Sequence, residues 1–216
     1  MEIPSEGGWT FENSEIARAF DDHVREQLPW YDLATGLTAH LIRHYLPQGG
    51  RLYDIGASTG NITKVVEGVI KDRAVEVIAL EPSAEMRELY KGVGDLVSER
   101  AEEYDYKEFD VAVLFLTMMF VPIKSREKLI CDLVRQCRKG GCIIIFDKSE
   151  PHGGYLSTVL YRLTLAGKVS TGTKPDEIIK KELSLSGCQR PYTCENTLAR
   201  EVFRFGDFVG WVIEIK

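Results

Sequence analysis

Hydrophobic residues first recur along the chain at helical spacing. Between residues 14 and 28 they form one apolar stripe after Ser14, a residue type that caps helix N-termini: Ile16, Phe20, Val24 and Leu28. Pro29 ends this segment, and a second stripe predicts a helix over 32–45 that stops before Pro47. Residues 1–50 are therefore predicted to form an N-terminal helical cap.

From residue 51 the pattern changes to short apolar runs separated by helical stretches. Strands are predicted over 51–55, 75–80, 94–98, 109–116 and 141–146, and helices over 61–70, 83–91 and 125–138. Nearly continuous apolar strands that alternate with helices indicate a parallel sheet covered on both faces. The predicted fold class is doubly wound α/β, with residues 51–148 as its cofactor-binding core.

The remaining third of the chain departs from this alternation. Residues 149–200 are predicted to be a mostly helical insertion, and two β-rich runs, 201–205 and 208–215, meet at Gly206-Asp207. That turn predicts a hairpin, so the last strand should run antiparallel to its neighbour. A closing hairpin over 201–216 completes a seven-stranded, mostly parallel sheet, and 216 residues suit a single domain over 1–216.

Composition and charge narrow the class of protein. A net charge of −6 and a pI near 5.4 argue against a protein that coats nucleic acid. The chain has no apolar run of the ~20 residues that cross a bilayer, and its first residues lack a signal-peptide pattern, so a cytoplasmic protein is expected. The five cysteines form no C-x-x-C pair, which predicts neither a disulfide framework nor a zinc site.

The sharpest motif lies at the end of the first predicted strand. It reads Tyr53-Asp54-Ile55-Gly56-Ala57-Ser58-Thr59-Gly60, and its glycines permit a tight turn and close backbone approach to a ligand. An acid ends the next strand, in Leu80-Glu81-Pro82-Ser83, 21 residues after Gly60. A carboxylate at that spacing accepts the ribose hydroxyls of several adenosine cofactors.

Two features of this motif favour S-adenosylmethionine over a dinucleotide. Ser58 stands where the dinucleotide fingerprint has its middle glycine, and Asp54 would repel a phosphate but attract an ammonium or sulfonium group. The segment 98–102 after the third strand, including Arg100 and Ala101, is expected to border the adenine; the alternative is a solvated charged loop. An ordinary strand–turn–helix with a satisfied aspartate is the alternative for the motif itself.

The chain resembles the carboxy-S-adenosylmethionine synthase family, a class I methyltransferase-like branch linked to wobble-uridine modification of tRNA. The resemblance rests on Trp9-Thr10-Phe11, Pro29-Trp30-Tyr31, the 53–60 motif with its serine, Thr117 with Phe120, and Lys148. It covers residues 9–150 well and the final hairpin loosely. It implies that Tyr31 closes over the methionyl carboxylate, that Asp54, Gly56 and Ser58 line the amino-acid end, and that the protein is a homodimer.

This chain also departs from the family at two places. Phe115 stands where the family has an asparagine, and Glu182 falls where an arginine would bind the extra carboxylate of the carboxylated cofactor. Arg190 and Arg200 are the alternative cations. A carboxylate beside another carboxylate is unfavourable, so the sequence predicts that S-adenosylmethionine binds at least as well as its carboxylated form.

Candidate acid–base residues follow the fifth strand, where such folds place the acceptor. They are Asp147, Lys148, His152 and Tyr155, although Asp147 and Lys148 also fit a solvated strand end. His40 and His44 have metal-ligand spacing but no third ligand, so no metal site is expected. Residues 148–200 carry eight Lys or Arg against five Asp or Glu, with three tyrosines interleaved, which fits a nucleic-acid surface or a solvated cap.

Three functions follow from these features. The first is a methyltransferase that uses S-adenosylmethionine on an undetermined acceptor, a nucleic-acid base among the candidates. The second is a synthase that carboxylates the cofactor using prephenate. The third is a cofactor-bound regulatory subunit without catalysis.

Overall fold

The computed structural model describes residues 21, 24–150 and 153–216. Most of the helix predicted over 14–28 lies outside these residues, although 24–27 are helical. The helix predicted over 32–45 is confirmed as α2 (Tyr31–Tyr45). Within the described part of the chain, no helix combines the length and apolarity that crossing a bilayer requires.

Seven strands form one sheet in the order β3-β2-β1-β4-β5-β7-β6. The first five run parallel, and β7 is antiparallel to both β5 and β6. The strands are β1 (Arg51–Ile55), β2 (Glu76–Leu80), β3 (Asp95–Val97), β4 (Phe109–Phe115), β5 (Cys137–Lys148), β6 (Ala199–Phe205) and β7 (Phe208–Glu214). The predicted fold class and the predicted closing hairpin are confirmed.

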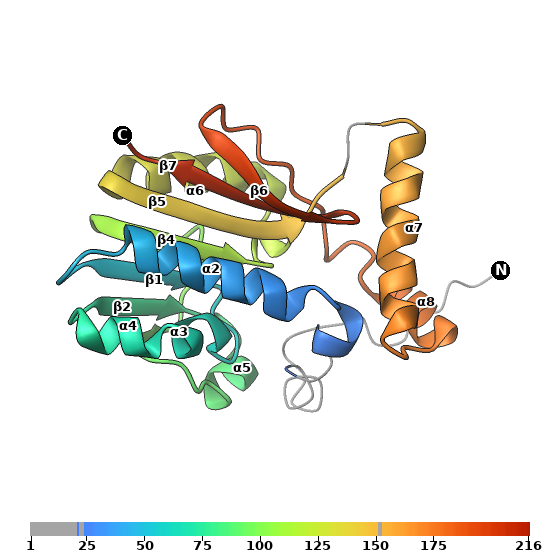
Figure 1. Ribbon diagram of the computed structural model, residues 1–216, viewed down its shortest axis with the longest axis horizontal. Coiled ribbons are helices and arrows are strands. Elements are labelled where there is room, and N and C mark those ends of the chain that lie inside the picture. Colours follow the sequence, from blue (N-terminus) through green and yellow to red (C-terminus); the bar gives the residue numbers. More distant parts are fainter. Residues whose placement is uncertain (1–20, 22–23, 151–152) are drawn as a thin grey trace.

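Helices cover both faces of this sheet (Figure 1). One apolar cluster joins α2, α3 (Asn61–Val65) and α4 (Glu67–Asp72) to the sheet, and the other joins α6 (Ile123–Gln136) to its opposite face. The middle of β4, from Val111 to Leu114, is fully buried between them. This two-sided burial explains why the strand reads as a continuous apolar run.

The structure differs from the predicted elements at three places. The single helix predicted over 61–70 is two short helices that break at Val66, in a stretch rich in β-branched residues and followed by Gly68. The helix predicted over 83–91 is shorter, α5 (Ala84–Glu88). Strand β5 is longer than predicted, because residues before Gly141 continue its pairing as far as Phe109.

Two helices of the predicted insertion stand beyond the carboxyl edge of the parallel strands (Figure 1). They are α7 (Tyr155–Ser170) and α8 (Pro175–Ser184). The turn between β6 and β7 packs against α7, where a Cβ on Gly206 would lie 2.1 Å from the Thr164 hydroxyl oxygen. Gly206 also has a φ of +58°, so glycine is required there on two counts.

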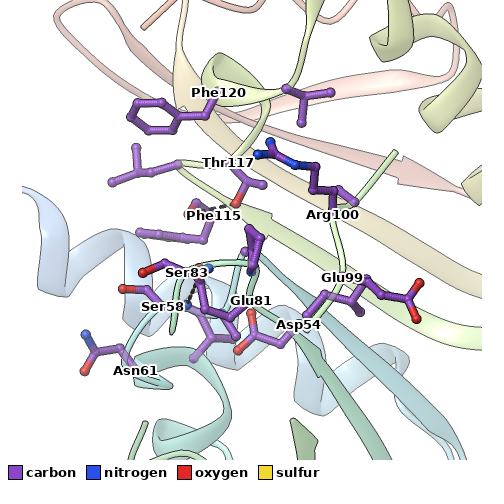
Figure 2. Close-up of a pocket in the computed structure, with 18 of the residues that line it drawn as sticks. Asp54, Ser58, Asn61, Glu81, Ser83, Glu99, Arg100, Phe115, Thr117 and Phe120 are labelled. Carbon is purple, nitrogen blue, oxygen red and sulfur yellow. Dashed lines mark hydrogen bonds between the residues drawn. The ribbon is translucent and has the colours of Figure 1, made fainter. Parts of the chain in front are cut away.

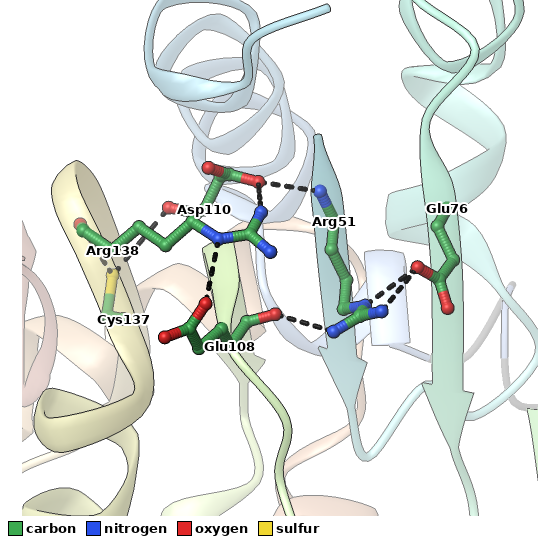
Figure 3. Close-up of polar contacts among 6 residues, drawn as sticks. All are labelled: Arg51, Glu76, Glu108, Asp110, Cys137 and Arg138. Atoms are coloured by element: carbon green, nitrogen blue, oxygen red, sulfur yellow. Dashed lines mark hydrogen bonds and ion pairs between the residues drawn. The ribbon is translucent and has the colours of Figure 1, made fainter. Parts of the chain in front are cut away.

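A polar network joins the amino-terminal ends of the parallel strands (Figure 3). Asp110 Oδ2 accepts the backbone N–H of Arg51 at 2.7 Å and the guanidinium Nη1 of Arg138 at 3.0 Å. The Arg51 side chain pairs with Glu76 Oε2 at 2.7 Å. These contacts join the starts of β1, β2, β4 and β5. The candidate site lies at the opposite, carboxyl ends of the strands.

Candidate cofactor site

A cavity of about 510 Å³ opens at the carboxyl ends of β1, β2 and β4. Figure 2 shows side chains from all three strand ends turned toward it. Eleven of the twelve residues predicted to bind the cofactor line this cavity: Tyr31, Asp54, Gly56, Ala57, Ser58, Glu81, Pro82, Arg100, Ala101, Phe115 and Thr117. Residues separated by almost ninety positions in the chain thus meet in one space.

The turn after β1 is bound to both neighbouring strands. The backbone N–H groups of Gly56 and Ala57 both donate to the Leu80 carbonyl at 2.9 Å. The Thr117 hydroxyl donates to the Ile55 carbonyl at 2.8 Å, and a Cβ on Gly56 would lie only 2.5 Å from that hydroxyl oxygen. Gly56 has a φ of +75°, so the turn needs glycine for both space and conformation.

Glu81 is fixed by backbone donors on two sides. Its Oε2 accepts the N–H of Ser58 at 2.8 Å, and its Oε1 accepts the N–H of Ser83 at 2.9 Å. Burial raises the pKa of the Glu81 carboxyl, and these two hydrogen bonds partly offset that effect. A carboxylate held in one orientation suits recognition of a vicinal diol, since each oxygen has a further lone pair.

Asp54 differs from Glu81, because a backbone hydrogen bond at Thr63 contacts its carboxylate but one of its oxygens has no partner among the described residues. It is 1% exposed, and its Oδ2 has no hydrogen-bond partner among the described residues. Burial raises the pKa of the Asp54 carboxyl to about 7, and the negative charge of Glu81 adds to the shift. An orphaned buried oxygen is costly in isolation, so this site fits a ligand that brings a cation or a hydrogen-bond donor.

Tyr31 closes one side of the cavity from the start of α2. Its ring packs edge-on against Phe115 with centroids 5.5 Å apart, and its hydroxyl accepts the Asn61 side-chain amide at 3.3 Å. Burial raises the pKa of Tyr31 to about 12, so the phenol stays neutral and able to donate. Tyr31 and Phe115 thus form an aromatic wall on this side of the cavity.

Comparisons with known proteins agree with this geometry. Residues 53–145 match the family model described as "Methyltransferase domain". The chain is similar to the carboxy-S-adenosyl-L-methionine synthase of Staphylococcus epidermidis, at 26% identity covering 94% of this chain and 91% of that protein. It is also similar to the protein of the same name from Sulfurimonas denitrificans, at 25% identity covering 93% and 92%.

Solved structures share the fold. The plantazolicin methyltransferase BpumL, solved in complex with SAH, has a TM-score of 0.61 at 10% identity. The match covers 94% of this chain and 90% of the BpumL chain. A putative S-adenosyl-L-methionine-dependent methyltransferase from Methanococcus maripaludis has a TM-score of 0.57 at 15% identity, covering 98% and 97%. The chain thus shares the fold of these methyltransferases, and its residues 53–145 match a methyltransferase-domain model.

One of the residues predicted to bind the cofactor does not line the cavity. Gly60, with a φ of +87°, precedes α3, and a Cβ there would lie 2.4 Å from the backbone nitrogen of Gly92. Its N–H donates to the Ala57 carbonyl at 2.8 Å. The glycine serves the turn and its packing against the segment after α5, so its place in the motif reflects backbone geometry.

Three of the four candidate acid–base residues, Asp147, Lys148 and Tyr155, lie outside the cofactor cavity. Asp147 is buried, where it accepts the backbone N–H groups of Lys148 at 2.9 Å and Met119 at 3.3 Å, and burial raises its pKa to about 7. Lys148 pairs with Glu182 and lines a second cavity. Tyr155 is 73% exposed at the start of α7, and His152 lies outside the described residues. A catalytic role for these residues stays a prediction.

Several lining residues were not singled out from the sequence. Asn61 directly follows the 53–60 motif, and Leu116 directly precedes Thr117. Their position beside predicted site residues was the available signal. Cys188 reaches the cavity from the coil after α8, where no local pattern indicates a site. Long-range placement of that coil is what brings the cysteine in.

Proposed function

We propose that this protein transfers a methyl group from S-adenosylmethionine to an acceptor that binds next to the cofactor. The observation that carries the proposal is the pairing of two unlike carboxylates in one cavity. Glu81 is fully oriented by backbone donors, whereas buried Asp54 keeps an oxygen without a partner. The first suits ribose hydroxyls and the second suits the cationic methionyl end.

The chain's own residues would divide the cofactor between them. Asp54 would hold the ammonium group with Tyr31 over the carboxylate, Glu81 the ribose, and the segment at Arg100 and Ala101 the adenine. When bound, the cofactor supplies an activated methyl group on a sulfonium. The protein's contribution is to align the acceptor and exclude water, which accounts for large rate effects without a dedicated base.

Cofactor carboxylation is the second candidate function. Both reported curated relatives are named carboxy-S-adenosyl-L-methionine synthase, and each match extends over more than nine-tenths of this chain. The structure also changes one argument against it. Glu182 does not stand as an isolated anion, because Lys168 Nζ lies 2.7 Å and Lys148 Nζ 3.4 Å from its carboxylate oxygens.

Arg190 and Arg200, the alternative cations for an extra carboxylate, lie elsewhere. Both are exposed, and neither lines either of the two cavities. The backbone of Arg190 instead joins the coil to Met119, to whose carbonyl its N–H donates at 2.9 Å. Carboxylation would therefore need a cation other than these two arginines.

Mass spectrometry of the ligand retained by the purified protein tests the assignment. We expect S-adenosylmethionine or its demethylated product, and no carboxylated cofactor after incubation with prephenate. A carboxylated product would replace the first function with the second. Retention of neither cofactor, together with no binding of added S-adenosylmethionine by calorimetry, would contradict both.

Among acceptors, a nucleic-acid base is one class that we propose to test, with tRNA as the family's example. Exposed Tyr155, Tyr161 and Arg162 on α7 support it. Tyr192 does not, because it is buried against Trp211 and beneath the Arg126 guanidinium. With only two of the three tyrosines available for stacking, a small-molecule acceptor is better supported.

We also propose a cytoplasmic homodimer in which α7 forms part of the interface. The support is a row of exposed apolar side chains at helical spacing: Tyr155, Leu156, Val159 and Leu163. Sedimentation of the wild-type protein and of Val159→Glu would test it. A dimer that the substitution dissociates fits the proposal, and a monomeric wild type contradicts it.

A further inference from the structure

Arg126 belongs to α6, but its side chain is buried in the protein. It is 8% exposed, which is uncommon for arginine. The guanidinium donates to three backbone carbonyls, from Nε to Val121 at 2.9 Å, from Nη1 to Pro191 at 2.9 Å and from Nη2 to Arg190 at 2.8 Å. One charged side chain thus joins two separate stretches of backbone.

Both of the stretches that Arg126 joins border the cofactor cavity. One is the segment 116–121 after β4, which we call the wall segment, and the other is the coil 188–192. Val121 at the end of the wall segment and Cys188 at the start of the coil both line the cavity. Arg126 therefore connects two parts of one cavity wall that are far apart in the chain.

The wall segment lies across the cavity from the expected ammonium site. Figure 2 shows Phe120 on the opposite side of the cavity from Asp54 and Asn61. Since Asp54 and Glu81 are expected to hold the cofactor, an acceptor would have to lie on the side of the wall segment. The placement of this segment and of the coil therefore determines the shape of the acceptor space.

The path of the coil depends on contacts with its neighbours, because residues 189–196 form neither helix nor strand. The N–H of Arg190 donates to the Met119 carbonyl at 2.9 Å, and the N–H of Tyr192 donates to the Lys148 carbonyl at 2.7 Å. The Tyr192 ring also lies 5.9 Å from the guanidinium carbon of Arg126. The coil is thus hydrogen-bonded to the wall segment and to the end of β5, with Arg126 between them.

Asp147 holds the same wall segment from β5. Its carboxylate accepts the N–H of Met119 at 3.3 Å, and the N–H of Met118 also donates to it. Arg126 therefore binds carbonyl groups of this wall, whereas Asp147, which is 1% exposed, binds its N–H groups. Two buried charges are unfavourable relative to apolar side chains of similar size, so packing alone does not account for them.

The wall segment also begins with a strained residue. Leu116 has a φ of +59°, a left-handed conformation that is unfavourable for a residue with a Cβ. Its N–H donates to the Phe146 carbonyl at 2.7 Å. Such a conformation persists where the surrounding structure determines it, and it is common at functional sites. Arg126 and Asp147 supply contacts of this kind to the residues that follow Leu116.

We propose that Arg126 is a positioning residue, which fixes the coil 188–192 against the wall segment and so completes the acceptor side of the cofactor cavity. Asp147 fixes the N–H groups of the same wall segment. Neither side chain lines the cavity, so their effect on methyl transfer passes through the wall. The inference rests on the proposed function, and it adds the residues that shape the acceptor space.

Hydrogen exchange in the ligand-free protein tests whether Arg126 holds the coil. Arg126→Met removes the three donors, so the amides of Arg190 and Tyr192 should exchange at least about tenfold faster as local opening becomes more favourable. Arg126→Lys keeps the charge but not the planar fork, so its exchange should be intermediate. Arg135→Met is the matched control, because Arg135 is exposed on the same helix. Equal acceleration by Arg135→Met, or wild-type exchange in Arg126→Met, would overturn the proposal.

Alkylation of Cys188 by iodoacetamide tests whether the coil is a wall of the cofactor cavity. At about ten times its Kd, S-adenosylmethionine should slow this reaction about tenfold in the wild type. Cys131, which is exposed on α6 and lies outside the cavity, should react at the same rate with and without the cofactor. The protection of Cys188 should be weaker in Arg126→Met and unchanged in Arg135→Met. No protection in the wild type, or full protection in Arg126→Met, would overturn the proposal.

Two further comparisons keep the outcome decisive. If Arg126→Met does not fold, Arg126→Lys takes its place, and wild-type exchange and protection in that variant would overturn the proposal. Calorimetry separates the inference from the proposed function. If the wild type binds S-adenosylmethionine but Cys188 is not protected, only the role of the coil is wrong. If the wild type does not bind it, the proposed function is wrong, and hydrogen exchange still tests whether Arg126 fixes the coil.

Discussion

Asp54 and Glu81 are buried in the wall of one cavity, yet only Glu81 has backbone donors for both of its oxygens. The negative charge of Glu81 adds to the effect of burial in raising the pKa of Asp54 to about 7. Without a cationic ligand, the ionised form of Asp54 is therefore unfavourable in the folded protein. Burial of this carboxylate lowers the stability of the folded protein, and a bound cation would restore it.

The first prediction concerns stability against pH. The pKa of Asp54 is raised on folding, so the folded state holds its proton longer, and stability falls as pH rises from about 4 to about 7. Asp54→Asn removes this titration. The free energy of unfolding of the variant, relative to that of the wild type, should therefore rise by about 2 kcal/mol from about pH 5 to about pH 8. Urea unfolding at both pH values measures this, and an unchanged difference would contradict it.

The second prediction concerns cofactor affinity. Asp54→Asn and Glu81→Ala each remove a charge-assisted contact worth about 1.5–3 kcal/mol, so S-adenosylmethionine should bind roughly tenfold to hundredfold more weakly. Glu76→Gln is a control at the opposite edge of the sheet, where the carboxylate pairs with Arg51. Calorimetry that finds wild-type affinity in both site variants would refute the assignment.

The third prediction is that NADH does not bind at concentrations up to about 1 mM. A dinucleotide needs free backbone N–H groups for its phosphates. Here the Ser58 N–H already donates to Glu81, and Asp54 adds a nearby negative charge. A fluorescence titration with saturation in the micromolar range would reverse this choice of cofactor.

The fourth prediction separates stability from binding at the amino edge of the sheet. Asp110→Ala leaves the Arg51 N–H and the Arg138 guanidinium without their shared acceptor, and should cost about 1–3 kcal/mol of unfolding free energy. Affinity for S-adenosylmethionine should not change, because the site lies at the other end of the strands. Reduced affinity with unchanged stability would be the contrary result.

Local sequence pattern predicted most of the sheet and most of the cofactor cavity. Asp54 and Glu81 could be found because a ligand at the carboxyl edge of a parallel sheet depends on residues directly after strands. The break at Val66 was missed because the apolar period continues through it. The second cavity was not predictable, because Lys148, Lys168 and Lys181 come from three elements whose relative placement depends on packing across the whole insertion.

The pairing of β5 with β7 has a consequence for biosynthesis. Lys148 is opposite Phe208, so sixty positions separate the two strands in the chain. On the ribosome, β5 emerges first, with Ile143, Ile144 and Ile145 in a strand that lacks its antiparallel neighbour. An unpaired apolar strand edge is a template for aggregation. The nascent chain thus exposes this strand edge until the closing hairpin has been made.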